Sequence, residues 1–169
     1  MIELERSYLA KTLPDLKDCK YKEIIDIYFP KESRHPVLRL RKNGNKYELT
    51  KKQPTGEDKT EMKEETIILT KEEFDVLSQI DGKKVGKKRY YYNYNERIAE
   101  VDVFIDNLKG LVYIEFEFDS REEKEAFTKP DFCLVEITQD EMLAGGMICG
   151  KTMDELEPHL NKYGYKRID

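Results

Sequence analysis

The chain has 169 residues, of which 38% are hydrophobic and 38% are charged, and its formal net charge at pH 7 is −5. This length predicts one domain over residues 1–169, and apolar residues that recur at regular spacing exclude a disordered chain. The negative total charge gives no support to bulk nucleic-acid binding, and no segment has the ~20 apolar residues of a membrane-spanning helix.

Alternation of polar and apolar residues with a period of two runs through most of the chain and predicts strands. In the first half we expect strands at Ile2–Ala10, Tyr21–Phe29, Pro36–Lys42, Lys46–Lys52 and Thr60–Leu69. A short turn or helix over 14–19 separates the first two. The Asn-Gly step within 43–45 predicts a hairpin between the third and fourth.

A helix is expected after the fifth strand, at Lys71–Ile80. Thr70, with Glu73 three residues later, forms a capping box at its start. Its apolar face has Phe74, Leu77 and Ile80 at three-residue spacing, with Val76 at the flank, and Asp81-Gly82 ends it.

The second half predicts strands at Val85–Tyr94, Arg97–Asp106, Leu111–Asp119 and Cys133–Thr138. Ser120 caps a short helix that runs through Phe127, and Thr152 or Asp154 opens a terminal helix to about Tyr163. About eight strands joined by short turns, with a few helices, predict an α+β fold. Its expected form is an eight-stranded antiparallel β-barrel, a tunnel, with peripheral helices.

Charged residues share one alternating face in strand after strand. Glu3/Glu5 and Glu115/Glu117 form acidic pairs, whereas Arg39/Arg41 and Lys87/Arg89 form basic pairs on other strands. For any single strand, a solvated outer face is the simpler interpretation. Surface charge is usually mixed in sign, however, so pure pairs on separate strands favour an acidic wall facing a basic wall inside a closed sheet.

Each wall has a chemical use. Clustered carboxylates supply the hard oxygen ligands that Mg²⁺ or Mn²⁺ prefers. Arginine pairs bind phosphate oxygens in bidentate fashion, and lysine adds point charge. The pattern therefore predicts a polyphosphate ligand with a divalent metal on the acidic wall.

Short motifs that contain these residues follow one another along residues 2–138. They are E-L-E-R-S-Y-L at 3–9, R-x-R at Arg39 and Arg41, L-T-x-K at Leu49–Lys52, K-x-R at Lys87 and Arg89, D-V-F at Asp102–Phe104, E-x-E-F at Glu115–Phe118 and Pro-Asp-Phe at Pro130–Phe132. In this order they resemble the CYTH domain, the fold of the triphosphate tunnel metalloenzymes. The family hallmark E-x-E-x-K matches at Glu3 and Glu5, but Ser7 stands in place of its lysine.

The resemblance implies an eight-stranded tunnel that binds a triphosphate, with Mg²⁺ or Mn²⁺ as cofactor. The implied metal ligands are Glu3, Glu5, Glu65, Asp102, Glu115 and Glu117. The implied phosphate contacts are Arg39, Arg41, Lys52, Lys63, Lys87 and Arg89. Glu3, Glu5 and Lys52 are expected to carry catalysis. Glu61, Lys63 and Glu65 match the family pattern of the middle strand only in part, and their register stays open.

Members of this family include thiamine triphosphatases, inorganic triphosphatases, class IV adenylate cyclases and RNA triphosphatases, and fold alone does not choose among them. We expect metal-dependent hydrolysis of inorganic triphosphate or of a triphosphorylated small molecule such as thiamine triphosphate or a nucleoside triphosphate. ATP cyclisation is one alternative. Because Ser7 is neutral and a poor base, a non-catalytic polyphosphate- or nucleotide-binding module is the other, unless Lys11 or Lys52 substitutes. A homodimer stays open.

Residues 145–152 match the P-loop pattern G-x-x-x-x-G-K-[ST] letter for letter. That motif works only between a parallel strand and a helix, and no parallel sheet is expected here. A glycine-rich bend before the terminal helix is favoured instead, and Lys151 is kept as a phosphate contact at the tunnel mouth.

The remaining residue types predict no further chemistry. His35 and His159 are expected at surface or turn positions, and most of the tyrosines at 90–94 are expected to pack the sheet. Tyr91 shares parity with Arg89 and is the one expected to touch an organic part of a ligand. The three cysteines are far apart and the N-terminus lacks signal-peptide features, so we expect a reducing, cytoplasmic setting without a disulfide or zinc site.

Overall fold

The computed structural model describes all residues, 1–169. Nine strands form one antiparallel sheet in the order β5-β4-β3-β2-β6-β7-β8-β1-β9, and a further β5–β1 pairing closes it. The strands are β1 (Ile2–Ala10), β2 (Tyr21–Phe29), β3 (Leu38–Asn43), β4 (Lys46–Pro54), β5 (Glu61–Leu69), β6 (Lys83–Tyr94), β7 (Arg97–Phe104), β8 (Val112–Phe118) and β9 (Cys133–Glu136).

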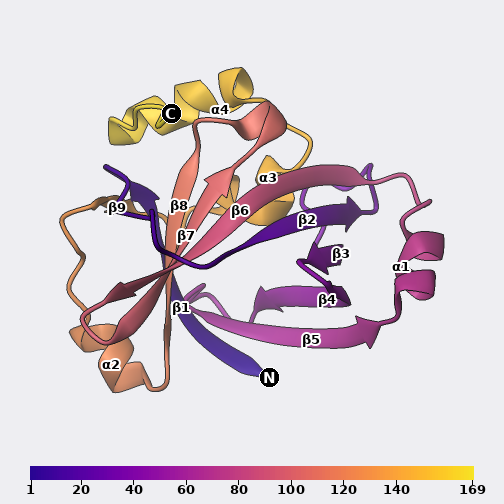
Figure 1. Cartoon of the computed structure of the whole chain (residues 1–169), viewed down its shortest axis with the longest axis horizontal. Helices are drawn as coiled ribbons and strands as arrows, with labels where there is room; N and C mark the ends of the chain where they lie inside the picture. The colour runs from indigo at the N-terminus through magenta and orange to yellow at the C-terminus, as the bar shows by residue number, and fades with distance from the viewer.

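Strand β1 closes the barrel because it pairs with three neighbours (Figure 1). Its first residues, 2–4, pair with β5, and residues 4–9 pair with β8 on the other edge. Its last residues, 8–10, pair with β9, which therefore lies outside the closed ring. The predicted eight-stranded antiparallel barrel is confirmed, and the ninth strand is the last one that the sequence predicted.

Two tight hairpins follow from residues that tolerate positive φ. Gly44 has φ +58° in the two-residue turn between β3 and β4, as the Asn-Gly step predicts. Asn95 and Glu96 have φ of 48° and 63° between β6 and β7. Positive φ at both central residues is the geometry whose twist matches that of the flanking strands.

The helices are short and lie around the barrel (Figure 1). They are α1 (Lys71–Leu77), α2 (Arg121–Ala126), α3 (Gly145–Ile148) and α4 (Met153–Leu160), with 3-10 turns η1 (Asp106–Leu108), η2 (Glu141–Leu143) and η3 (Asn161–Tyr163). The capping box of Thr70 and Glu73 forms as predicted, and Thr152 makes a second one with Glu155. The sequence predicted neither α3 nor the 3-10 turns.

Helix α1 is shorter than predicted and buries less of its apolar face. Phe74 and Leu77 pack against the buried cluster of Ile27, Phe29 and Leu40. The side chains of Val76 and Ile80 stay exposed, because the helix ends at Leu77 before a third turn can bring Ile80 onto the barrel. The expectation that Ile80 belongs to the packed face was wrong.

Most of the hydrophobic core lies outside the barrel, although a few of its residues, including Phe104 and Tyr113, line the cavity. In β8 the residues Val112, Ile114, Phe116 and Phe118 are buried against α2, β9 and the aromatic side chains of β6. A second cluster packs the C-terminal segment, including Met153, Leu156 and Leu160 of α4, against the strand ends. Because successive strand residues point to opposite faces, this outer core leaves the alternate residues of each strand to face the interior.

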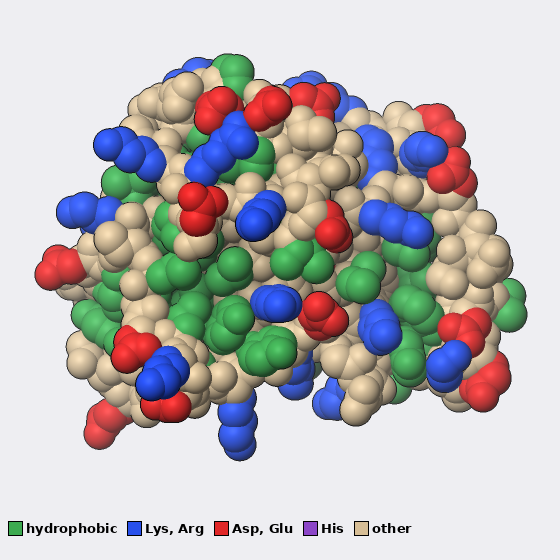
Figure 2. Space-filling model, turned by 45° about the horizontal axis from the view of Figure 1, so that its top comes forward, with side chains coloured by type: hydrophobic (Ala, Val, Ile, Leu, Met, Phe, Trp, Pro, Cys, Tyr) green, Lys and Arg blue, Asp and Glu red, His purple; other side chains and the backbone are tan.

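The outer surface is mixed in charge. On the face shown in Figure 2, acidic and basic side chains are interspersed, with hydrophobic side chains between them. No helix has the length and apolar character needed to cross a membrane.

Candidate functional site

The barrel encloses a cavity of about 590 Å³ to which each of its eight strands contributes side chains. The charged lining residues are Glu3, Glu5, Asp26, Arg39, Arg41, Glu48, Lys52, Lys59, Glu64, Lys87, Arg89, Glu115, Glu117, Asp140 and Glu141. One end is covered by residues 137–148, which contribute the apolar side chains of Ile137, Leu143 and Ile148.

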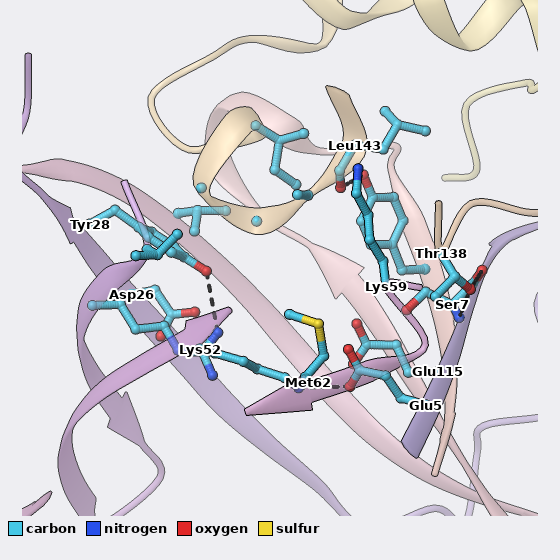
Figure 3. A pocket seen from close by; sticks show the side chains of 18 of the residues that line it. Glu5, Ser7, Asp26, Tyr28, Lys52, Lys59, Met62, Glu115, Thr138 and Leu143 are labelled. Atoms are coloured by element: carbon cyan, nitrogen blue, oxygen red, sulfur yellow. Dashed lines mark hydrogen bonds and ion pairs between the residues drawn. The ribbon is translucent and has the colours of Figure 1, made fainter. Parts of the chain in front are cut away.

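Four carboxylates form an acidic wall on the adjacent strands β1 and β8. Glu5 lies opposite Glu117 in the strand register, and Glu115 lies opposite Ser7. The Nζ atom of Lys52 lies 2.7 Å from one carboxylate oxygen of each of Glu3 and Glu5. Figure 3 shows Glu5 and Glu115 pointing into the cavity on the same side.

The negative charge of this wall is only partly compensated. Burial raises the pKa of Glu5, and the charges of Glu115 and Glu3 add to this effect while Lys52 opposes it. Burial likewise raises the pKa of Glu117, with the nearby charge of Glu3 as the next cause. Like charges that destabilise one another in this way create a place where a bound cation is stabilised.

Arg89 and Lys87 of β6 face this wall, and Asp102 of β7 binds both of them. Arg89 donates to Asp102 through Nε at 2.6 Å and Nη2 at 2.7 Å, and to Glu115 at 2.5 Å. Lys87 donates to the same Asp102 carboxylate. Burial alone would raise the pKa of Asp102, but Arg89 and Lys87 outweigh it and hold the pKa at about 2. Asp102 is therefore a permanent counter-ion that fixes the two cations.

The two arginines of β3 are held differently from each other. Arg41 makes a bidentate pair with buried Asp26, at 2.7 and 2.8 Å. Arg39 donates to the hydroxyl of Tyr28 at 3.4 Å and lies 3.8 Å from Glu64, so its guanidinium is less firmly engaged. Its buried Nε atom has no hydrogen-bond partner. Arg39 is thus a poorly satisfied cation on the cavity wall.

The structure brings nine of the predicted site residues to the cavity. They are Glu3, Glu5, Glu115 and Glu117 on the acidic side and Arg39, Arg41, Lys52, Lys87 and Arg89 on the basic side. Asp102 does not line the cavity, because its carboxylate is fully buried and both its oxygens are bound by Lys87 and Arg89.

Three further predictions are corrected by their placement. Lys63 and Glu65 lie on the outer face of β5, where their side chains are 53% and 63% exposed and 3.1 Å apart. Met62 and Glu64 take the inward positions instead, one residue out of the expected phase. Lys151 does not line the cavity, because its segment forms α3 and the loop before α4 and not a phosphate-binding turn.

The structure adds residues that the sequence analysis missed. Asp26 and Glu64 line the cavity, as do Tyr28 and Lys59. A single acidic residue in the apolar run of β2 was a signal for Asp26. Tyr91, by contrast, does not line the cavity, whereas Tyr92 and Tyr94 pack edge-on against Phe132 outside the barrel.

The carboxylates of the acidic wall match a hard divalent cation in their chemistry. They supply oxygen donors on neighbouring strands, and burial together with like charge raises the pKa of two of them. No group of three or more His, Cys, Asp or Glu residues is already arranged around a metal position, and Glu3, Glu5 and Glu115 instead contact Lys52 and Arg89. Metal binding therefore requires these ion pairs to open.

Known proteins resemble this chain along most of its length. It is 30% identical over 142 residues to an inorganic triphosphatase of Nitrosomonas europaea, in an alignment that covers 83% of this chain and 91% of that protein. A crystal structure of an inorganic triphosphatase is 26% identical with a TM-score of 0.64, covering 88% of this chain and 95% of that one. A putative adenylate cyclase of Bacillus halodurans, 16% identical, shares the fold with a TM-score of 0.55, covering 99% of this chain and 92% of that one. The model of the CYTH domain matches residues 1–136, and this chain belongs to the CYTH domain family.

Proposed function

We propose that the cavity binds a triphosphate together with Mg²⁺ or Mn²⁺ and hydrolyses the terminal phosphoanhydride bond. The observation that carries this proposal is the enclosed interior, where five cations that the sequence predicted face four carboxylates on neighbouring strands. The similarity to an inorganic triphosphatase over most of both chains supports hydrolysis as the reaction.

Binding is an exchange of ion pairs. In the structure Lys52 is bound by Glu3 and Glu5, and Arg89 is bound by Glu115. Phosphate oxygens are strong acceptors for lysine and arginine, so a triphosphate competes with the carboxylates for these cations. The carboxylates released are then free to hold a divalent cation, which also neutralises phosphate charge. Phosphate binding to the cations therefore favours metal binding by the carboxylates, and metal binding in turn favours phosphate binding.

The cations of β3, β4 and β6 hold the phosphate chain and stabilise the charge that develops on its oxygens. Glu3, Glu5, Glu115 and Glu117 would hold the metal, which supplies Lewis acidity at the phosphate when it is bound. Water attacks the terminal phosphorus, the bond to the bridging oxygen breaks, and phosphate and diphosphate form. Lys52, which contacts both Glu3 and Glu5, would neutralise charge on the attacked phosphate.

Ser7 favours a second candidate function, binding without turnover. It lines the cavity beside the acidic wall, and its hydroxyl makes no hydrogen bond. A neutral hydroxyl here neither adds positive charge nor serves as an effective base. A protein that retains the binding groups and lacks an effective reacting group would hold polyphosphate or nucleotide without cleaving it.

One assay separates these functions. The purified protein is incubated with tripolyphosphate, thiamine triphosphate or ATP, with Mg²⁺ or Mn²⁺ and with a chelator as control. We expect phosphate release that requires the metal. Cyclic AMP from ATP would contradict hydrolysis and indicate a cyclase. Tight binding by calorimetry, without release of phosphate from any of the three, would indicate the binding module.

A further inference from the structure

The loop between β4 and β5 is tied to the segment that closes one end of the cavity. The Oδ1 atom of Asp58 accepts hydrogen bonds from Thr60 N at 2.9 Å, Thr60 Oγ1 at 2.7 Å and Gln139 Nε2 at 2.9 Å. The side-chain oxygen of Gln139 in turn accepts from Lys59 N at 3.2 Å. The backbone of Lys59 is therefore fixed by a residue 80 positions away in the chain.

A buried lysine of α2 also contacts this loop. Lys124 of α2 is 4% exposed, and its Nζ donates to Thr60 Oγ1 at 2.5 Å and lies 3.6 Å from Asp58. Burying a lysine destabilises the folded state unless the ammonium group is paired and hydrogen-bonded. This arrangement therefore costs more stability than an ordinary surface loop requires. Lys59 is the one residue of this loop whose charged side chain lines the cavity.

The ammonium group of Lys59 is held much more loosely than its backbone. Three lysines line the cavity, and Lys52 and Lys87 are each bound directly by carboxylates. The Nζ atom of Lys59 makes only a 3.3 Å bond to the backbone oxygen of Gln139 and lies 3.9 Å from Glu141. An ammonium group that makes only weak contacts is available to bind a ligand, and the fixed backbone keeps it near the cavity.

Lys59 is linked to Ser7 indirectly, through residues 137–139. The backbone of Ser7 bonds to Thr138 Oγ1 and accepts from Ile137 N, while Lys59 bonds to the next residue, Gln139. Figure 3 shows the side chain of Lys59 beginning near Thr138 and extending along the cavity, with its ammonium group toward Leu143. The two candidates that the sequence offered as substitutes are less suitable, because Lys11 is exposed and Lys52 is held by Glu3 and Glu5.

We propose that Lys59 is a phosphate-binding residue of this cavity, and that it supplies the positive charge that neutral Ser7 does not give to this part of the wall. The inference rests on the proposed function, because it assigns one more contact to the same triphosphate. On ligand binding, the ammonium leaves the weak contacts to Gln139 and Glu141 for a phosphate oxygen.

The test is steady-state hydrolysis of tripolyphosphate with Mg²⁺ by wild type, Lys59→Met, Lys59→Arg and the control Lys51→Met. Lys51 is exposed on the outer face of β4 and is expected to have no effect. Loss of one charge-assisted hydrogen bond predicts an increase in KM on the order of tenfold for Lys59→Met, with a much smaller change in kcat. Lys59→Arg should retain most of the affinity, and Ser7→Lys added to Lys59→Met should restore it.

An unchanged KM in Lys59→Met would overturn this inference and leave the proposed function intact. An equal loss in Lys59→Arg, or a failure of Ser7→Lys to restore affinity in a folded double variant, would also overturn it. If wild type binds tripolyphosphate without turnover, the dissociation constant from calorimetry replaces KM in the same comparison. If wild type neither binds nor hydrolyses it, the proposed function fails and this inference fails with it.

Discussion

Asp26 and Arg41 show how one buried carboxylate sets both the position and the charge of an arginine in the cavity. Asp26 is 3% exposed and pairs with Arg41 in bidentate geometry. Burial alone would raise the pKa of Asp26, but the charge and hydrogen bonds of Arg41 outweigh it and lower the pKa from 3.8 to about 2. Because the pKa is lower in the folded state, the pair stabilises the fold above about pH 4, and this contribution is lost as the pH falls towards 2.

Asp26→Asn should therefore lower the free energy of unfolding more at pH 5 than at pH 2.5. From the two pKa values, the difference between these losses is roughly 1.5 kcal/mol. Urea unfolding of both proteins at the two pH values measures it. Asp119→Asn, at an exposed position, is the control and should change stability little at either pH. An equal loss at both pH values for Asp26→Asn would contradict the role of the ionised pair.

Helix α3 closes one end of the cavity, and its position depends on two glycines. A Cβ atom on Gly146 would overlap the backbone oxygen of Pro36, and one on Gly145 would lie 2.5 Å from the hydroxyl oxygen of Tyr28. Only residues without a side chain let α3 approach the loop before β3 this closely. Gly145, the first glycine of the P-loop-like pattern, and its neighbour Gly146 thus serve packing.

Gly146→Ala should force α3 away from Pro36 and lower the free energy of unfolding by about 1–3 kcal/mol, the usual effect of overpacking. The matched control is Gly56→Ala, because a Cβ atom there meets nothing within 4 Å. Urea unfolding of both variants checks the prediction. Similar stabilities for the two would show that α3 is not fixed by this contact.

The inward-facing residues of strand β5 could not be predicted from the sequence. In β3 and β8 charged and apolar residues alternate, so the inward face could be predicted from the pattern, whereas in β6, where Lys87, Lys88 and Arg89 are consecutive, it was the K-x-R motif that identified the inward residues. Residues 61–65 read E-M-K-E-E, where charge occurs at four of five positions and alternation gives no phase. Pairing with β4 and β1 decides the register, and it turns Glu64 inward and Glu65 outward.

Other parts of the site depend on contacts that no local pattern contains. Lys59 belongs to an irregular loop and is positioned by Gln139, far away in the sequence. Helix α3 has four residues, too few to show a helical period. Asp102 shares the parity of the charged set, but only the fold shows that two cations bind both of its oxygens.

At the scale of the whole molecule, this barrel places its apolar core outside and its charges inside. The buried residues Ala99 and Val101 of β7 and Val112, Ile114, Phe116 and Phe118 of β8 pack outward, and the inner face carries cations paired with carboxylates. Buried ion pairs add little net stability relative to apolar packing, so their presence throughout the interior points to binding and not to folding.

The exchange of ion pairs predicts that metal and triphosphate bind cooperatively. Either one alone leaves part of the interior charge unpaired, whereas both together satisfy the carboxylates and the cations. Thermal unfolding with Mg²⁺ alone, tripolyphosphate alone and both should give a combined rise in Tm larger than the sum of the separate rises. A combined shift no larger than that sum would contradict the coupling.

The most direct test of the account is whether hydrolysis depends on the acidic wall. Phosphate release from tripolyphosphate with Mg²⁺ is measured for wild type, Glu5→Gln and the control Glu72→Gln, which alters an exposed residue of α1. Loss of one charged group at the reacting centre predicts a fall in kcat/KM on the order of a hundredfold for Glu5→Gln, with no change for the control. Metal-dependent release by Glu5→Gln at the wild-type rate would contradict the assignment of this cavity as the catalytic site.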